Sequence, residues 1–148
     1  MANDFNLINN VILNGNIWVS GSLSAPNSII QIGIFNIRNY GSKDLVITLN
    51  NQGTIVHDAG GDLYLNNSAQ INNQVGAVYE AQDAEIRSAS GANGTAFNNA
   101  GTLKKTSSSN AIIDVEFNNT GQVNVEQGIL LISGGGVSDN GQFNIAHG

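Results

Sequence analysis

The chain has 148 residues, and 24 Asn and 18 Gly dominate its composition, with only 11% charged residues. Asn and Gly disfavour helix interiors and recur every few positions, which argues against a helix-rich protein. The 41% of apolar residues argue equally against a disordered chain. A formal charge of -6 with five basic residues argues against nucleic-acid binding, and the lack of cysteine excludes disulfides and thiolate metal sites.

The amino-terminal residues 1–10, MANDFNLINN, contain no basic segment followed by an apolar one, so no export signal is visible. No run of about 18 apolar residues occurs in the chain, which predicts no membrane insertion. The five basic residues are also too few for a polybasic anchor on a membrane surface.

Strand-like alternation begins at residues 14–21, NGNIWVSG, where Ile17 and Val19 are separated by a single residue. Residues 28–49 form a more eroded copy of the same pattern and align poorly with the later ones. We therefore predict one domain over residues 1–148, with degenerate coils in 1–48 and clear repeats in 49–148.

An internal repeat is the main signal of the clear region. In most copies an apolar residue is followed by two Asn, one variable residue and Gly, and then by apolar residues at alternate positions; the second copy has one extra residue before Gly, and the last copy lacks the Asn pair. The copies are LNNQG at 49–53, INNQVG at 71–76, FNNAG at 97–101, FNNTG at 117–121 and VSDNG at 137–141. Alternation with period two predicts short strands, and Asn and Gly tolerate the backbone angles of tight corners.

A unit of two or three short strands cannot bury its apolar face alone, so successive units must stack on one another. We predict an all-β, single-stranded parallel β-solenoid of about seven coils, each of roughly 20 to 25 residues. An antiparallel β-sandwich is the alternative, but its strands do not normally repeat corner residues in register. The polar tracts GANGTA at 91–96, TSSSN at 106–110 and SGGG at 133–136 are predicted to be bulging corners.

The stacking predicts which residues of the repeat lie above one another. The predicted inward column is Leu49, Ile71, Phe97, Phe117 and Val137. The predicted ladder of hydrogen-bonded amides, placed at a corner, is Asn50, Asn72, Asn98 and Asn118. These residues have a structural task in the repeat, so their presence does not require a binding role.

The segments FNNAGTL, FNNTGQVNVEQGILLISGGG and NNQGTI resemble the repeats of bacterial surface and secreted proteins of the haemagglutinin-like and autotransporter-like kind. The resemblance covers residues 49–148 and implies a right-handed parallel β-helix. It also implies an extracellular or cell-surface location and a role as an adhesive or spacer stalk. Some tail spikes and polysaccharide lyases share this shape and carry enzymatic sites, but none of their catalytic motifs can be matched here.

The carboxylates do not form an obvious catalytic set. The candidates are Asp58, Asp62, Asp83, Glu85, Asp114, Glu116 and Glu126. At a step of twenty residues they do not fall above one another, so we interpret them as solvated acids and predict no catalytic residues. AGGDLYL at 59–65 has one Asp after two Gly and no second copy, which argues against a calcium repeat.

The remaining chemistry-bearing residues also have simple interpretations. His57 is expected to be a half-buried corner residue, and Lys104 and Lys105 are expected to be solvated. The aromatic residues Trp18, Tyr40, Tyr64 and Tyr79 could stack on sugar rings but come from different units without a shared phase. We therefore predict no enzyme, no cofactor and no metal.

The function predicted from these patterns is structural. A solenoid normally carries caps, and neither end of this sequence shows one, so we expect association through the solenoid ends. The first hypothesis is a β-solenoid segment of an extracellular fibre, stalk or adhesin. The alternative is a carbohydrate-binding module, or a fragment of a polysaccharide-active or tail-spike protein, with a polysaccharide or another cell-surface ligand.

Overall fold

The structure is a computed structural model. It describes residues 33–37, 41–58 and 61–146, together with five short strands within residues 5–31. Every regular element in these described parts is a β-strand. Among the described residues, none forms a helix that is long and apolar enough to cross a membrane.

The strands form three sheets, which we name A, B and C. Sheet A contains β1 (Phe5–Asn6), β4 (Leu23–Ser24), β7 (Lys43–Leu45), β10 (Gly61–Leu65), β13 (Ala84–Ser88), β16 (Asn110–Asp114) and β19 (Ile129–Ile132). Sheet B contains β2 (Val11–Leu13), β5 (Ser28–Gln31), β8 (Thr48–Asn51), β11 (Gln70–Asn73), β14 (Ala96–Asn99) and β17 (Glu116–Asn119). Sheet C contains β3 (Asn16–Val19), β6 (Ile34–Ile37), β9 (Thr54–His57), β12 (Val78–Ala81), β15 (Thr102–Lys105), β18 (Gln122–Val125) and β20 (Gln142–Ile145).

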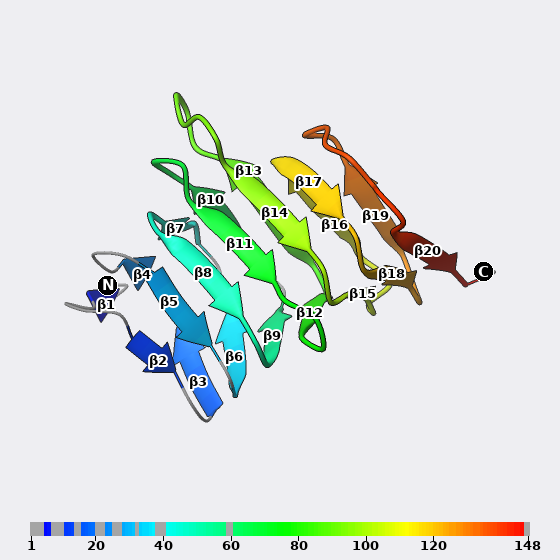
Figure 1. Cartoon of the computed structure of the whole chain (residues 1–148), viewed down its shortest axis with the longest axis horizontal. Coiled ribbons are helices and arrows are strands. Elements are labelled where there is room, and N and C mark those ends of the chain that lie inside the picture. Colours follow the sequence, from blue (N-terminus) through cyan, green and yellow to red (C-terminus); the bar gives the residue numbers. More distant parts are fainter. Residues whose placement is uncertain are drawn as a thin grey trace.

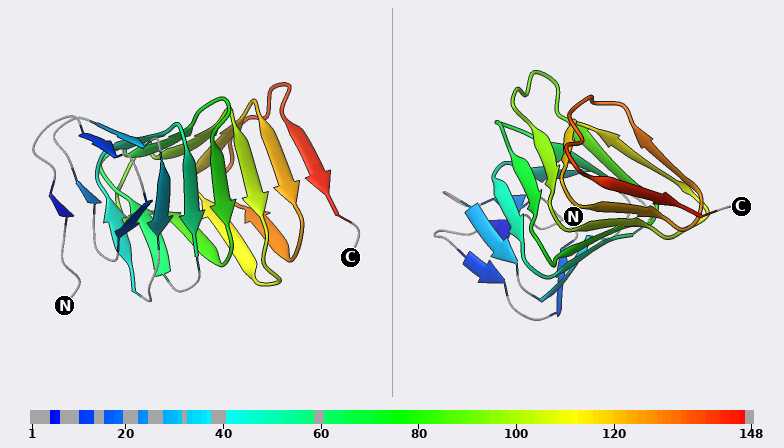
Figure 2. Two further views of the ribbon diagram at one scale, coloured as in Figure 1. Left: turned by 90° about the horizontal axis from the view of Figure 1, so that it is seen from below. Right: turned by 45° about the vertical axis from the view of Figure 1, so that its right-hand side comes forward.

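The chain visits sheets A, B and C in turn, and each strand pairs in parallel with the strand one coil away (Figure 1). Figure 2 shows the strands as stacked rungs and the three sheets arranged around a common interior. This confirms the predicted all-β parallel β-solenoid, and the parallel pairing excludes the antiparallel sandwich. Residues 41–146 make about five turns, and strands β1–β6 precede them in the same three sheets.

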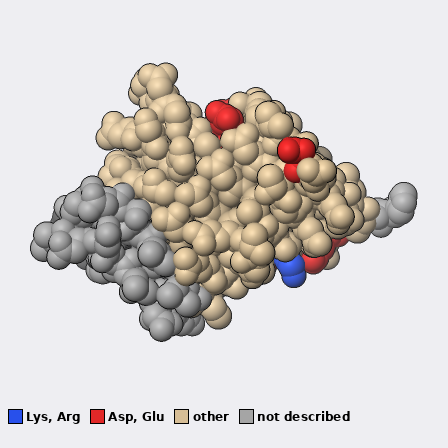
Figure 3. Space-filling model, viewed as in Figure 1, with Lys and Arg blue, Asp and Glu red and all other residues tan. Residues whose placement is uncertain are grey.

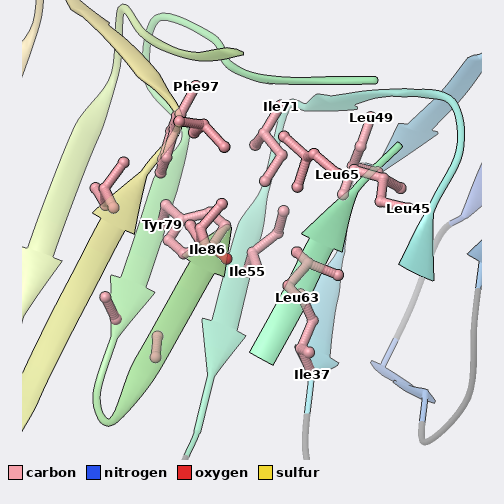
Figure 4. Packing of buried hydrophobic residues seen from close by; sticks show 14 of the residues in the cluster. Ile37, Leu45, Leu49, Ile55, Leu63, Leu65, Ile71, Tyr79, Ile86 and Phe97 are labelled. Atoms are coloured by element: carbon pink, nitrogen blue, oxygen red, sulfur yellow. The ribbon is translucent and has the colours of Figure 1, made fainter. Parts of the chain in front are cut away.

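The core fills the space between the three sheets (Figure 4). Strands such as β8, β9, β11 and β12 alternate half-buried and buried residues, because successive side chains point to opposite faces of a sheet. In sheet B, Leu49, Ile71, Phe97 and Phe117 lie in register and are all buried. The ring centroids of Phe97 and Phe117 are 5.6 Å apart in an edge-to-face arrangement, which aromatic pairs favour.

The prediction that Val137 continues this inward column is wrong. Ser138 pairs with Asn119, so Val137 lies above Asn118 and its side chain is 66% exposed. Gly136 takes the place opposite Phe117, where a Cβ would lie 2.0 Å from the Phe117 carbonyl oxygen. A shift of one residue moves a side chain to the other face of a sheet, which explains why Val137 points outward.

The polar tracts lie in connections between strands, as predicted. GANGTA follows β13 and ends at Ala96, the first residue of β14. TSSSN follows β15 and ends at Asn110, the first residue of β16. SGGG lies between β19 and the bridge at Ser138. Their different lengths make the coil length vary: equivalent buried Asn residues are 22, 26 and 20 positions apart along the chain. The solenoid therefore keeps its rungs in register and places the length differences at the corners.

Candidate functional site

The most regular side-chain arrangement is a ladder of amides on the outer face of sheet B. Asn72 Nδ2 donates to Asn50 Oδ1 at 2.9 Å, Asn98 Nδ2 to Asn72 Oδ1 at 2.8 Å and Asn118 Nδ2 to Asn98 Oδ1 at 3.1 Å. These side chains are half-buried within strands β8, β11, β14 and β17, so their predicted place at a corner is wrong. The face seen in Figure 3, which lies over these strands, carries few charged side chains.

A second ladder lies inside the core and was not predicted. The Asn that follows each outer-ladder residue points inward, because consecutive strand residues face opposite sides. Asn51 Nδ2 donates to Asn73 Oδ1 at 2.8 Å, Asn73 Nδ2 to Asn99 Oδ1 at 2.7 Å and Asn99 Nδ2 to Asn119 Oδ1 at 2.8 Å. These four side chains are at most 1% exposed. The sequence feature that could have predicted this ladder is the repeated Asn-Asn pair, because two consecutive residues of a strand face opposite sides of the sheet.

The buried ladder also closes the corner between sheets B and C. Asn51, Asn73 and Asn99 each donate a further hydrogen bond to a backbone carbonyl of sheet C in the next coil, at Val78, Thr102 and Gln122. Asn51 Oδ1 accepts from the backbone N–H of Gly53, and Asn119 Oδ1 accepts from that of Gly121. The two ladders therefore join neighbouring coils on both faces of sheet B.

The outer face of sheet A carries a cluster of charged groups, which we name the Arg87 cluster: Asp62, Tyr64, Glu85, Arg87 and Asp114. Asp62 is in register with Glu85, and Arg87 lies between Tyr64 and Asp114. Arg87 Nε lies 2.9 Å from Glu85 Oε2 and 3.4 Å from Asp62 Oδ2, and its Nη1 lies 3.8 Å from Asp114 Oδ2. The prediction that the acids do not stack is wrong here, because the coils at this face are longer than twenty residues.

Tyr64 is the aromatic member of the Arg87 cluster. Its hydroxyl donates a 3.0 Å hydrogen bond to Asp62 Oδ2, which raises the pKa of the phenol. The ring is half-buried on the same outer face as the charged groups. The cluster therefore presents one aromatic ring beside carboxylates and a guanidinium, a combination that can bind a polar ligand. Within the described residues, no group of three acidic or histidine side chains is placed to hold a metal ion.

Several other predicted candidates have structural positions. His57 is fully buried rather than half-buried, and its Nδ1 lies 2.9 Å from the Tyr79 hydroxyl. Tyr79 is itself a core residue, and burial raises the pKa of its phenol. The side chains of Trp18 and Tyr40, and residues 59–60 of the AGGDLYL segment, lie outside the described residues.

Lys105 is buried, so the prediction that it is solvated is wrong. It occupies an inward position of sheet C, the same position that His57 has two coils earlier. Its Nζ donates to the backbone oxygen of Ser107 and, at 2.9 Å, to Ser107 Oγ. Burial lowers the pKa of the ammonium, and nearby Asp83 offsets this only in part. Lys104, the preceding residue, lies half-buried on the outer face.

Replacing Lys105 by Met is expected to change how stability depends on pH. Because burial lowers the pKa of Lys105 in the folded state, the unfolded chain binds the proton more tightly and stability rises as the pH approaches 10.5. Lys105→Met removes this contribution, so the free energy of unfolding rises less between pH 7 and pH 10 in urea titrations. Lys104→Met is the control and retains the wild-type rise; an equal rise in both variants would contradict the prediction.

The last described coil leaves part of the core uncovered. Phe143 and Ile145 of β20 continue the inward positions of sheet C, yet they are 48% and 70% exposed. Val123, which Phe143 covers, is fully buried. Leu130 and Ile132 of β19 are only half-buried and pack against the core. We name these four residues, Leu130, Ile132, Phe143 and Ile145, the terminal face.

The fold and these features define the class of protein. Comparison of the chain with models of known families, with curated proteins and with solved structures finds no match. The chain is a parallel β-solenoid repeat protein whose coils are joined by amide ladders. The part of the predicted resemblance that concerns the solenoid fold is confirmed. Its bacterial and cell-surface parts stay predictions.

Proposed function

We propose that the chain is a rigid β-solenoid segment of an extracellular fibre, stalk or adhesin, without catalytic activity, which associates with other copies end to end. The fold is compatible with this structural role, because stacked coils form a rod whose length grows with the number of repeats. Parallel sheets join the described coils to one another, and two ladders of amides join the four coils that contain β8, β11, β14 and β17. The extracellular location is proposed from the resemblance of the repeat units.

The uncovered terminal face is the observation that carries the proposed association. Outside the last coil, the exposed large apolar residues in the described part of the chain are Ile34 and Val75. Of the exposed residues in the last coil, Ile129, Leu131 and Val137 lie on the outer faces of the solenoid. Phe143 and Ile145 belong to the terminal face, together with Leu130 and Ile132. An apolar patch of this kind, bordered by the open edges of two parallel sheets, is typical of an interaction surface.

Sedimentation velocity over a range of concentrations tests this proposal. We expect the wild type to form larger species as its concentration rises. The double variant Phe143→Asp/Ile145→Asp should need at least about tenfold more protein to reach the same size, because it charges two side chains that association would bury.

The control is Val75→Asp, which charges a residue that is 86% exposed at a corner on the side of the rod. It should associate like the wild type. Far-ultraviolet circular dichroism checks that all three proteins keep their strands. A wild type that stays monomeric at every concentration, or a double variant that associates normally, would refute the proposed association.

The second candidate function is the binding of a carbohydrate at the cell surface, and the Arg87 cluster favours it. Tyr64 offers a ring for stacking, while the carboxylates and Arg87 offer acceptors and donors for hydroxyl groups. We expect Tyr64→Ala to lower binding on a glycan array by about tenfold, or about 1.4 kcal/mol. Tyr64→Phe, which keeps the ring, should retain most of the binding. No glycan bound by the wild type, or equal binding by the Ala variant, would exclude this candidate.

A further inference from the structure

The terminal face carries a sequence pattern that recurs at the other end of the stack. β20 and its preceding corner read NGQFNI at residues 140–145, and β3 with its preceding corner reads NGNIWV at residues 14–19. β3 and β20 are the two end strands of sheet C. Both begin after Asn-Gly and place apolar residues at their second and fourth positions, so each could follow the other in the same repeat.

We propose that the terminal face binds the first coil of a second copy of this chain, with β3 of that copy paired in parallel with β20. In this register Phe143 lies opposite Ile17, Asn144 opposite Trp18 and Ile145 opposite Val19. The inference rests on the proposed end-to-end association and adds to it the partner strand, the direction and the register.

The pairing of β18 with β20 inside the chain provides the template for this register. Gln122, Val123 and Asn124 lie opposite Gln142, Phe143 and Asn144, and Asn144 Nδ2 donates to Asn124 Oδ1 at 2.9 Å. At these three positions polar residues therefore stack on polar residues, and an apolar residue stacks on an apolar one. A slip of one residue would place the apolar residues of one strand against the polar residues of the other, which an interface with a buried side disfavours.

The other two sheets agree with the same arrangement. β19 ends sheet A and β1 is its opposite end strand, while Ser138 bridges to the last strand of sheet B and β2 is the opposite end strand of that sheet. The chain order A, B, C is therefore the same in the last coil and in the first. All pairs are parallel, so each added copy presents the same surface again. Such a head-to-tail contact is heterologous and forms an open linear filament rather than a closed dimer.

Cysteine cross-linking tests the register, because the chain contains no cysteine. Adjacent parallel strands place paired Cα atoms about 4.8 Å apart, within the range that a disulfide spans. We therefore mix an Asn144→Cys chain with a Trp18→Cys chain under mild oxidation. We expect a covalent dimer on a non-reducing gel from the mixture, at least tenfold more than from either variant alone.

Two further proteins make the experiment specific. A mixture of Asn144→Cys with Asn16→Cys offsets the thiols by two residues, which separates the Cα atoms by about 8 Å and should prevent the link. The single chain Asn124→Cys/Asn144→Cys pairs thiols of neighbouring strands that the structure shows in register, so it should lose its free thiols without forming dimers. Sedimentation of each variant, compared with the wild type, shows that association itself is intact.

The outcomes separate this inference from the proposed function. Association with equal or stronger linking in the offset mixture overturns the register and leaves the proposed association standing. Linking of Asn144→Cys to itself shows a two-fold contact and overturns the head-to-tail direction. A protein that stays monomeric in sedimentation overturns both.

Discussion

Replacing Asn99 by Ala is expected to lower the free energy of unfolding by about 3 kcal/mol, because three buried hydrogen bonds of about 1 kcal/mol each are lost. Asn99 Oδ1 accepts from Asn73, and its Nδ2 donates to Asn119 Oδ1 and to the backbone oxygen of Gln122. With the side chain 1% exposed, water cannot replace these partners. Urea unfolding followed by circular dichroism measures the change.

The neighbouring residue Asn98 provides the matched control. It makes the same type of ladder contact, with Asn72 and Asn118, but on the half-exposed outer face of β14. Water can satisfy the amides that Asn98→Ala leaves behind, so we expect a loss below about 1 kcal/mol. Equal losses in the two variants would show that burial does not decide the strength of these ladders.

The second large effect is expected from Gly121→Ala, which should destabilise the fold by about 3 kcal/mol, at the upper end of overpacking effects. A Cβ at Gly121 would lie 2.1 Å from the backbone oxygen of Gly101 and 2.7 Å from the carbonyl carbon of Ala100. Both atoms belong to the backbone of the preceding coil, which cannot move away without breaking the stacking at this corner. The repeat glycines Gly101, Gly121 and Gly141 thus mark close approaches between parts of the chain, whereas a Cβ at Gly76 would meet no atom within 4 Å.

Thermal and urea unfolding of Gly121→Ala should be compared with Thr120→Ala, which changes the adjacent exposed residue. The Thr120 variant is expected to stay within about 0.5 kcal/mol of the wild type, as is usual for surface substitutions. If the two variants unfold at the same urea concentration, the coils are not packed as closely as the structure indicates.

The repeat made the solenoid predictable, because alternation defines strands and the recurring Asn and Gly define how strands stack. Leu49, Ile71, Phe97 and Phe117 could be placed above one another from their spacing alone. Val137 could not, since the slip that turns it outward comes from the local length of the SGGG corner. Spacing along the sequence does not show where within a corner an extra or missing residue is accommodated, so the register of the following strand cannot be predicted from it.

The candidate sites were less predictable, for two physical reasons. Corner loops lengthen the coils at sheet A and bring Arg87 close to Asp62 and Asp114. A prediction that assumes a constant step of twenty residues does not place these three residues next to one another. Lys105 was expected in solvent because a cation is costly to bury, yet the alternation of β15 places it inward beside Ser107. In both cases the register between coils, rather than the residue type, decided the environment.

The two amide ladders have opposite directions along the rod. The outer ladder donates from each coil to the one before it, whereas the buried ladder donates to the one after it. The dipoles of the side-chain amides therefore oppose each other coil by coil, unlike the aligned peptide dipoles that accumulate along an α-helix. A longer stack of these repeats would gain mechanical continuity without these amides building up opposite partial charges at its two extremities.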